Sequence, residues 1–126
     1  MWIGDSGASI HMLNNLNGVT EIEEINDTVT LGDDRTVEAP KRGVFRGVVK
    51  QVDGSTQNVS LKVKYVPSLW INLLSITQAI KNGMSLTNDA DSMILTNGNC
   101  QVKFDRKLSN FNGNTMTVYI LSLIHI

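Results

Sequence analysis

Alternating apolar and polar positions run through much of the chain and predict strands. Within the predicted strand at residues 57–66, Val59, Leu61, Val63 and Tyr65 alternate with the polar residues Ser60, Lys62 and Lys64. Period two of this kind is typical of a half-buried antiparallel strand. Residues 44–52 form the other arm of the predicted hairpin. We interpret the face of residues 57–66 that carries Lys62 and Lys64 as solvated rather than as a nucleic-acid patch.

A shorter hairpin is predicted earlier in the chain. Residues 28–39 alternate on both sides of a polar turn made of Gly32, Asp33, Asp34 and Arg35. Glycine and aspartate are favoured in such turns because they accept unusual backbone angles and short local hydrogen bonds. The expectation is a hairpin with an exposed tip.

The second half of the chain adds short strands and one helix. An Asn-Gly pair at 97–98 is the sequence of a tight hairpin turn. Residues 76–82 are the one convincing helix, with Ser75 as its N-cap and Gly83 at its C-terminal end. Further strands are predicted at residues 84–87, 92–96, 100–104 and 115–121. The predicted fold class is all-β with one short helix.

Composition narrows the functional classes. The chain has 126 residues, 18% charged residues and a formal net charge of −1, so no strong field points to nucleic acid or to an acidic membrane. Its single cysteine, Cys100, excludes an internal disulfide and fits a reducing, intracellular compartment. We expect no metal site, no cofactor, no membrane span and no signal peptide.

The candidate chemistry lies at Asp5, Ser6 and Gly7. An aspartic protease places such an Asp-Ser-Gly on a tight turn, where the hydroxyl holds the turn and glycine allows close approach. The same tripeptide is also an ordinary turn sequence. Gly4 makes the motif Gly-Asp-Ser-Gly, as in chymotrypsin-like serine proteases, but that chemistry needs a histidine and an aspartate earlier in the chain. The serine-protease interpretation therefore fails.

Aspartic-protease chemistry requires two carboxylates that share a proton. The chain contains no second Asp-[Ser/Thr]-Gly besides the one at Asp5. The partner carboxylate would therefore come from a second copy, in a homodimer with the site on its two-fold axis.

Two blocks in this order carry a family resemblance: residues 2–12, WIGDSGASIHM, and residues 65–76, YVPSLWINLLSI. The chain resembles the aspartic protease (retropepsin-like) segment of copia-type LTR retrotransposon Gag-Pol polyproteins over residues 2–121. Gly4 departs from the bulkier apolar residue that retroviral-type proteases prefer before the aspartate, and Ser75 stands where many retroviral relatives have glycine.

The resemblance implies a retropepsin-like closed β barrel with a half-site per chain. It implies that Asp5 is catalytic, that Ser6, Gly7 and Ala8 support the catalytic loop, and that the tip at residues 32–35 is a candidate flap over the substrate. The implied substrate is the Gag-Pol polypeptide, cleaved in the cytoplasm or in virus-like particles. Leu73 and Leu74 are expected in the core beneath Asp5, and His11 is expected to be structural.

We expect one protease domain over residues 1–121, cut at both ends. Residues 122–126 match one reading frame of a sequencing adapter and are interpreted as a non-native tail, although a short apolar strand is the alternative. Two functional alternatives stay open: a catalytically inactive retropepsin-like fragment, and a peptide-binding module.

Overall fold

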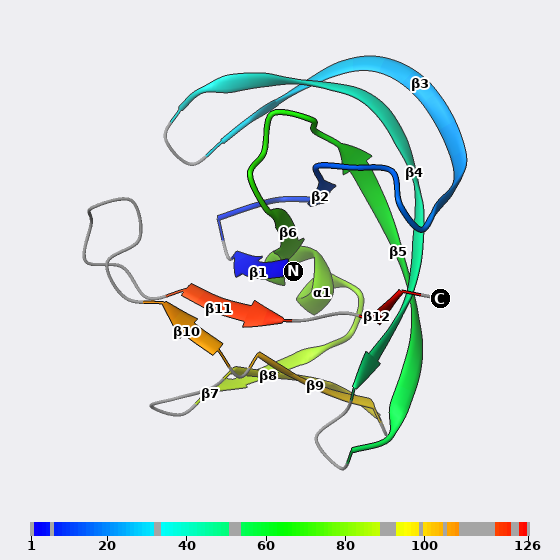
Figure 1. Cartoon of the computed structure of the whole chain (residues 1–126). Coiled ribbons are helices and arrows are strands. Elements are labelled where there is room, and N and C mark those ends of the chain that lie inside the picture. Colours follow the sequence, from blue (N-terminus) through cyan, green and yellow to red (C-terminus); the bar gives the residue numbers. More distant parts are fainter. Residues whose placement is uncertain are drawn as a thin grey trace.

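The structure is a computed structural model that describes residues 2–5, 7–31, 34–50, 54–88, 93–98, 100–104, 106–108, 118–121 and 124–125. It is mostly β with one short helix, as the sequence patterns predict (Figure 1). The elements in chain order are β1 (Trp2–Asp5), β2 (His11–Leu13), β3 (Val19–Thr30), β4 (Thr36–Lys50), β5 (Thr56–Tyr65), β6 (Asn72–Ser75), α1 (Ile76–Lys81), β7 (Ser85–Asn88), β8 (Met93–Asn97), β9 (Cys100–Phe104), β10 (Arg106–Leu108), β11 (Val118–Leu121) and β12 (Ile124–His125).

Nine strands form one mixed sheet. Eight of them follow the order β10-β11-β1-β6-β2-β5-β4-β12, and β3 pairs with β4. Two neighbouring pairs are parallel, β1 with β6 and β2 with β5, and the β3–β4–β5 segment is antiparallel. The remaining strands, β7, β8 and β9, make a separate three-stranded antiparallel sheet.

The described strands do not close into the barrel that the resemblance implies. The strand path begins at β10 and ends at β12, and these two strands do not pair. Both end strands are short, with three residues in β10 and two in β12. Within the path, β2 is three residues long and pairs with β5 only at Val63, Lys64 and Tyr65. The rest of β5 has a described partner on one side alone, namely β4.

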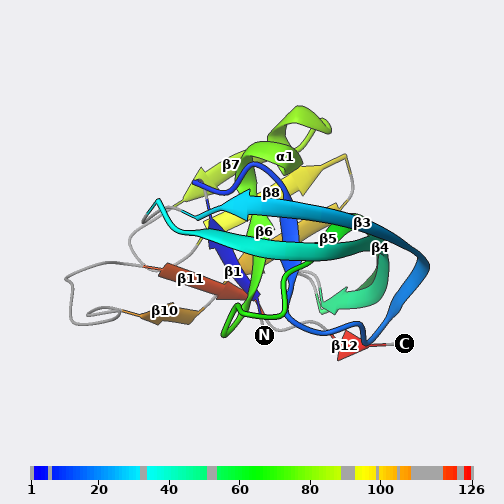
Figure 2. The ribbon, with the colours of Figure 1, turned by 90° about the horizontal axis from the view of Figure 1, so that it is seen from above.

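The β3–β4 hairpin is longer and more curved than its sequence pattern predicts. It arches over the other strands in Figure 1 and crosses in front of them in Figure 2. Two register shifts interrupt the pairing along β3, and each contains a residue of positive φ, Glu21 at 55° and Asn26 at 48°. Such bulges bend a strand and increase its twist.

Gly43 allows the two strands of this bent hairpin to approach closely. A Cβ atom at Gly43 would lie 2.5 Å from Val19 Cγ1 and 2.8 Å from the Thr20 carbonyl oxygen. The second contact is to backbone, which cannot move aside without shifting the strand, so the curvature requires glycine here.

The main core lies under β1, β4 and α1. Trp2 is fully buried and meets Phe45 edge to face, with 5.1 Å between ring centroids. Leu74, predicted as core, is buried at 7% exposure in the same cluster, whereas Leu73 is half-buried and packs against a second cluster. The prediction of core residues in this segment is thus confirmed for Leu74 and met in part for Leu73.

Local signals in the second half of the chain are confirmed. Helix α1 begins after Ser75, whose hydroxyl accepts a hydrogen bond from the Gln78 N–H, and Gly83 follows it at φ +95°. Gly98 lies in the turn between β8 and β9. β12 pairs with Gly47 and Val48 of β4, and the boundary proposed after residue 121 stays a prediction.

Candidate active site

Asp5 is the last residue of β1 and lies at the start of a short loop that leads to β2. Its backbone lies beside that of Ser75, because β1 and β6 run parallel in register. Its carboxylate Oδ1 accepts a hydrogen bond of 2.7 Å from the Gly7 N–H. This bond fixes the orientation of the carboxylate relative to its own loop.

The residue at position 7 must be small for this arrangement. A Cβ atom on Gly7 would lie 3.2 Å from Asp5 Oδ1, which is tight enough to displace the carboxylate by a few tenths of an ångström. Ala8 is buried at 8% exposure beneath the loop. Ser6, the other predicted support residue, lies outside the described residues.

Ser75 supports the Asp5 loop through a set of hydrogen bonds that we call the brace. Its hydroxyl donates a 2.6 Å hydrogen bond to the Ala8 carbonyl oxygen and also accepts from the Gln78 N–H at 3.0 Å. The side chain is fully buried, so both bonds are shielded from water. One residue therefore joins the loop, β6 and the first turn of α1.

His11 completes this brace on the β2 side. Its Nδ1 accepts a 2.9 Å hydrogen bond from the Ser75 N–H, and the side chain is 3% exposed. Burial disfavours the charged imidazolium and lowers the pKa of His11 to about 4, so the ring is neutral at pH 7. Because Nδ1 accepts, the proton is assigned to Nε2. His11 thus has the structural role expected for it.

The predicted flap is the distal end of the β3–β4 hairpin. Leu31 donates its N–H to the Arg35 carbonyl at 2.8 Å, and Asp34, at φ 65°, donates to the Leu31 carbonyl at 3.0 Å. Gly32 and Asp33 lie outside the described residues. The described parts of the hairpin end and the loop after β1 lie on the same side of the molecule in Figures 1 and 2.

Packing connects the hairpin end to the Asp5 loop. Val29 and Ala39, buried near that end, share a cluster with Met12 of β2 and Val66. Ile10, the last residue of the Asp5 loop, packs against the same cluster. Apolar side chains of one cluster therefore connect the hairpin to the loop that holds Asp5.

Neither of the two main cavities is at Asp5. They have volumes of about 310 and 430 Å³ and lie beside β5, and Asp5 lines neither of them. Asp5 is half-buried at the end of β1.

If one chain supplied both acids, the candidates for the second would be Asp27 and Asp53. Asp27 holds Lys64 Nζ at 2.6 Å. That hydrogen bond, a bond from the Thr28 N–H and the charge of Lys64 hold the pKa of Asp27 below its ordinary value. Asp53, the other alternative, lies outside the described residues.

The described residues hold no cluster of three or more His, Cys, Asp or Glu side chains arranged for a metal ion. None of the helices described is long and apolar enough to cross a membrane.

The sequence predicted only some of the contacts that Ser75 and His11 make beneath the Asp5 loop. Ser75 was predicted as a helix cap, and residues 72–75 as the segment beneath Asp5, but the bond from Ser75 to Ala8 joins residues 67 positions apart. The signal available was serine at a position where related proteases often have glycine. A serine at this position needs a hydrogen-bond partner for its hydroxyl, which glycine does not.

Comparison with known proteins gives one match. No curated protein and no solved structure matches the chain. The family described as Pol polyprotein, beta-barrel domain, matches residues 2–84, which is more than half of the chain and includes β1, the Asp5 loop, both long hairpin strands, β6 and α1. The chain therefore belongs to the Pol polyprotein beta-barrel domain family and is a segment of a retrotransposon or retroviral Pol polyprotein.

Proposed function

We propose that this domain is one half of an aspartic endopeptidase of a copia-type retrotransposon, with Asp5 as the catalytic carboxylate of each chain. The observation that carries the proposal is the held orientation of Asp5, whose carboxylate accepts the Gly7 N–H on a loop braced by Ser75 and His11. Membership of a Pol polyprotein family supports it, because such polyproteins carry enzymes.

In this proposal the active enzyme is a homodimer. Two Asp5 carboxylates meet at a two-fold axis, where they cannot both ionise freely and share one proton. The ionised carboxylate takes a proton from water as the oxygen attacks the peptide carbonyl carbon. The protonated carboxylate gives its proton to the carbonyl oxygen, which forms a gem-diol. As the C–N bond breaks, the first carboxylate passes the proton it took from water to the amide nitrogen, and a gem-diol hydroxyl returns a proton to the second carboxylate.

The rest of the proposed site follows from its neighbours. Ser6 holds the loop of the opposite subunit, while Gly7 and Ala8 leave room for the substrate backbone. The hairpin end at residues 32–35 covers an extended peptide and excludes water, as lids over such sites do. The substrate is the Gag-Pol polypeptide of the same element, cleaved within the cell or in virus-like particles.

A cleavage assay tests the proposal directly. Peptide cleavage should be sensitive to pepstatin, should rise per chain with protein concentration, and should disappear in Asp5→Asn, which keeps the shape but cannot shuttle a proton. Excess Asp5→Asn chains mixed with active chains should poison activity, because mixed dimers lack one carboxylate. Cleavage by verified Asp5→Asn would end the proposal, and cleavage by a strict monomer would end the half-site argument.

A second candidate is a non-catalytic peptide-binding module within the polyprotein. The observation that favours it is the position of the two cavities, which lie along β5 and not at Asp5. Under this alternative no peptide is cleaved at any protein concentration, and peptide binding does not change in Asp5→Asn.

A further inference from the structure

One edge of β5 carries backbone groups that no described strand takes up. β4 pairs with β5 along its whole length, from Thr56 to Tyr65. On the opposite edge β2 pairs only with residues 63–65. The first seven residues of β5, 56–62, therefore present one edge without a described neighbouring strand, and such an edge is a template for another extended segment.

The hydrogen-bond pattern identifies which residues face this edge. Opposite residues of an antiparallel pair either bond each other or both point away. Arg46, opposite Ser60, donates its N–H to the Gly18 carbonyl at 2.9 Å, so Ser60 also directs its N–H and C=O away from β4. Val66, six residues on, donates to the Leu13 carbonyl on the same side. By alternation, the backbone groups of Asn58 and Lys62 face the free edge with those of Ser60.

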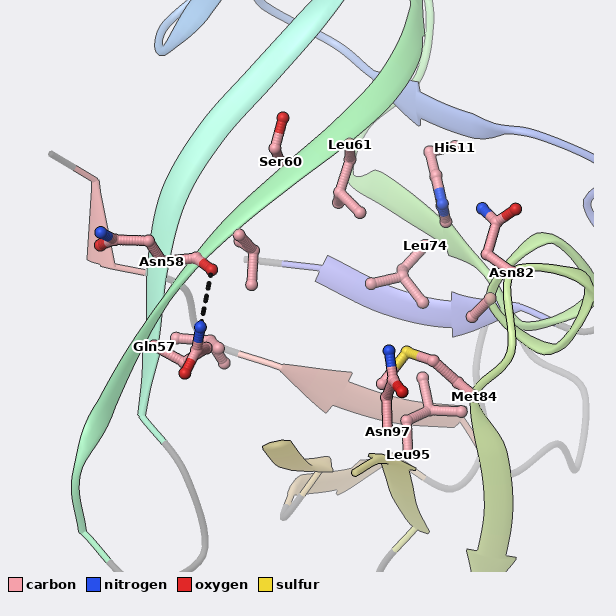
Figure 3. Close-up of a pocket in the computed structure, with 13 residues that line it drawn as sticks. His11, Gln57, Asn58, Ser60, Leu61, Leu74, Asn82, Met84, Leu95 and Asn97 are labelled. Atoms are coloured by element: carbon pink, nitrogen blue, oxygen red, sulfur yellow. Dashed lines mark hydrogen bonds between the residues drawn. The ribbon is translucent and has the colours of Figure 1, made fainter. Parts of the chain in front are cut away.

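A groove runs along these residues. The 310 Å³ cavity is lined by every residue from Gln57 to Leu61, and the 430 Å³ cavity continues with Ser60, Leu61 and Lys62. In Figure 3 the space lies between β5 on one side and Leu74 and Asn82 on the other. No described element therefore caps the edge over this stretch, and the two cavities lie beside it.

The one described bond to this edge comes from a neighbouring side chain. Gln57 Nε2 donates to the Asn58 carbonyl oxygen at 3.5 Å, the dashed line in Figure 3. That bond is long, and both residues are exposed, so a better donor can displace it at little cost.

The lining indicates the chemistry of the occupant. Its floor is apolar, with Val49, Leu74 and Leu95 buried, and its rim carries amide and hydroxyl groups. Lys62 supplies its one full charge, because no carboxylate lines either cavity and His11 is neutral at pH 7.

We propose that the β5 edge, residues 57–62, binds an extended peptide of another polypeptide as an added strand. The peptide has apolar side chains at alternate positions, facing the groove floor, and an acidic side chain near Lys62. Its backbone exchanges hydrogen bonds with Asn58, Ser60 and Lys62, and its alternate side chains provide selectivity, as in other cases of strand addition. Asp5 itself lines neither cavity, whereas Ile10 of its loop lines one of them and His11 lines both.

The test uses the full chain with Asp5→Asn, so that no peptide is cleaved during binding. The probe is a library of synthetic peptides of about eight residues, long enough to span the free edge. Alternate positions are apolar, and one end is aspartate. A matched library carries lysine at that end, and a proline-interrupted library serves as the negative control, since proline removes backbone donors.

We expect peptides selected from the aspartate library to bind and to protect the amides of Asn58, Ser60 and Lys62 from hydrogen exchange. Ser60→Pro removes one edge N–H while leaving the β4 side intact, and should weaken binding about tenfold, whereas Ser60→Thr should not. Lys62→Glu, at an exposed position, should shift preference to the lysine library even if Ser60→Pro fails to fold.

Three results would overturn the proposal. The first is equal recovery from the alternating and the proline-interrupted libraries. The second is protection of amides elsewhere on the molecule by the selected peptides. The third is protection of the same amides that appears without peptide and rises with protein concentration, which would make a second copy of the chain the occupant.

Discussion

The Asp5 loop and the β3–β4 hairpin are held by opposite kinds of interaction. Beneath the loop, Ser75 and His11 are almost fully buried and bonded to one another, and Ser75 bonds the Ala8 carbonyl. The part of the hairpin away from the buried Val29 and Ala39 carries ion pairs on its surface instead. Arg42 meets Glu23 at 2.7 Å with side chains 60% and 62% exposed, and Arg46 meets Glu21 at 3.6 Å.

The contacts beneath the Asp5 loop are therefore expected to be rigid, and the β3–β4 hairpin is expected to deform more easily. Buried hydrogen bonds are costly to break because the groups released find no water. Exposed ion pairs contribute little and are screened by salt. In the proposed function a hairpin covers a fixed carboxylate, which is consistent with this division, and local opening is expected to begin in the hairpin.

The largest expected effect is in the core under the Asp5 loop. Leu74→Ala removes a buried side chain and should lower the free energy of unfolding by about 2–5 kcal/mol, with a smaller loss for half-buried Leu73→Ala. Ile22→Ala, on the hairpin at 45% exposure, should cost less than about 1 kcal/mol. Urea denaturation measures the free energy of unfolding of the three variants. Similar losses for Leu74→Ala and Ile22→Ala would show that the core and the hairpin do not differ as expected.

The next effect is a pH dependence that belongs to the rigid support. The pKa of His11 is lowered to about 4 in the folded chain, from an ordinary value of 6.5, so below pH 6.5 the unfolded chain takes up the proton first. Stability is therefore fully present above pH 6.5 and falls towards pH 4, by about 3 kcal/mol over the whole window.

His11→Asn is the matched control for this pH dependence, because asparagine keeps an acceptor near the position of Nδ1 and does not titrate. Urea denaturation between pH 5 and 7 should show a steeper fall in the unmodified chain than in the variant. Parallel curves would mean that His11 is not the group responsible.

The smallest effect is expected from the hairpin ion pairs. Glu23→Gln removes the partner of Arg42 and should cost about 0.5 kcal/mol at low salt and nearly nothing at molar salt. Glu24→Gln, on the same strand and also exposed, is the control, since no ion pair is described for it. A loss above about 2 kcal/mol, or one that persists in high salt, would show that the hairpin is not held as proposed.

Predictability from the sequence follows the range of the interaction. The β4–β5 hairpin and α1 were predictable, because period-two alternation and the Ser75 cap act between residues close in the chain. The bends in β3 were not, since glutamate, as at Glu21, rarely adopts positive φ, and asparagine, as at Asn26, adopts it at only some positions.

The candidate site shows the same limit. Asp5 was found from a local motif, and the place of residues 72–75 beneath it from a resemblance. The parallel pairing of four-residue β1 with β6 leaves no periodic signal, because both strands are short. No pattern in the sequence marks that the strand path ends at β10 and β12 without closing.

The bond between Ser75 and Ala8 also bears on the order in which the chain folds. It joins residues 67 positions apart, and closing a loop of that length costs roughly 4 kcal/mol of chain entropy before any contact compensates. The antiparallel β3–β4–β5 segment joins neighbours in sequence and should form earlier. During synthesis, the loop carrying Asp5 emerges before β6 and α1 and cannot be fixed until they have followed. The candidate catalytic group is thus assembled late, after most of the segment matched by the family has been made.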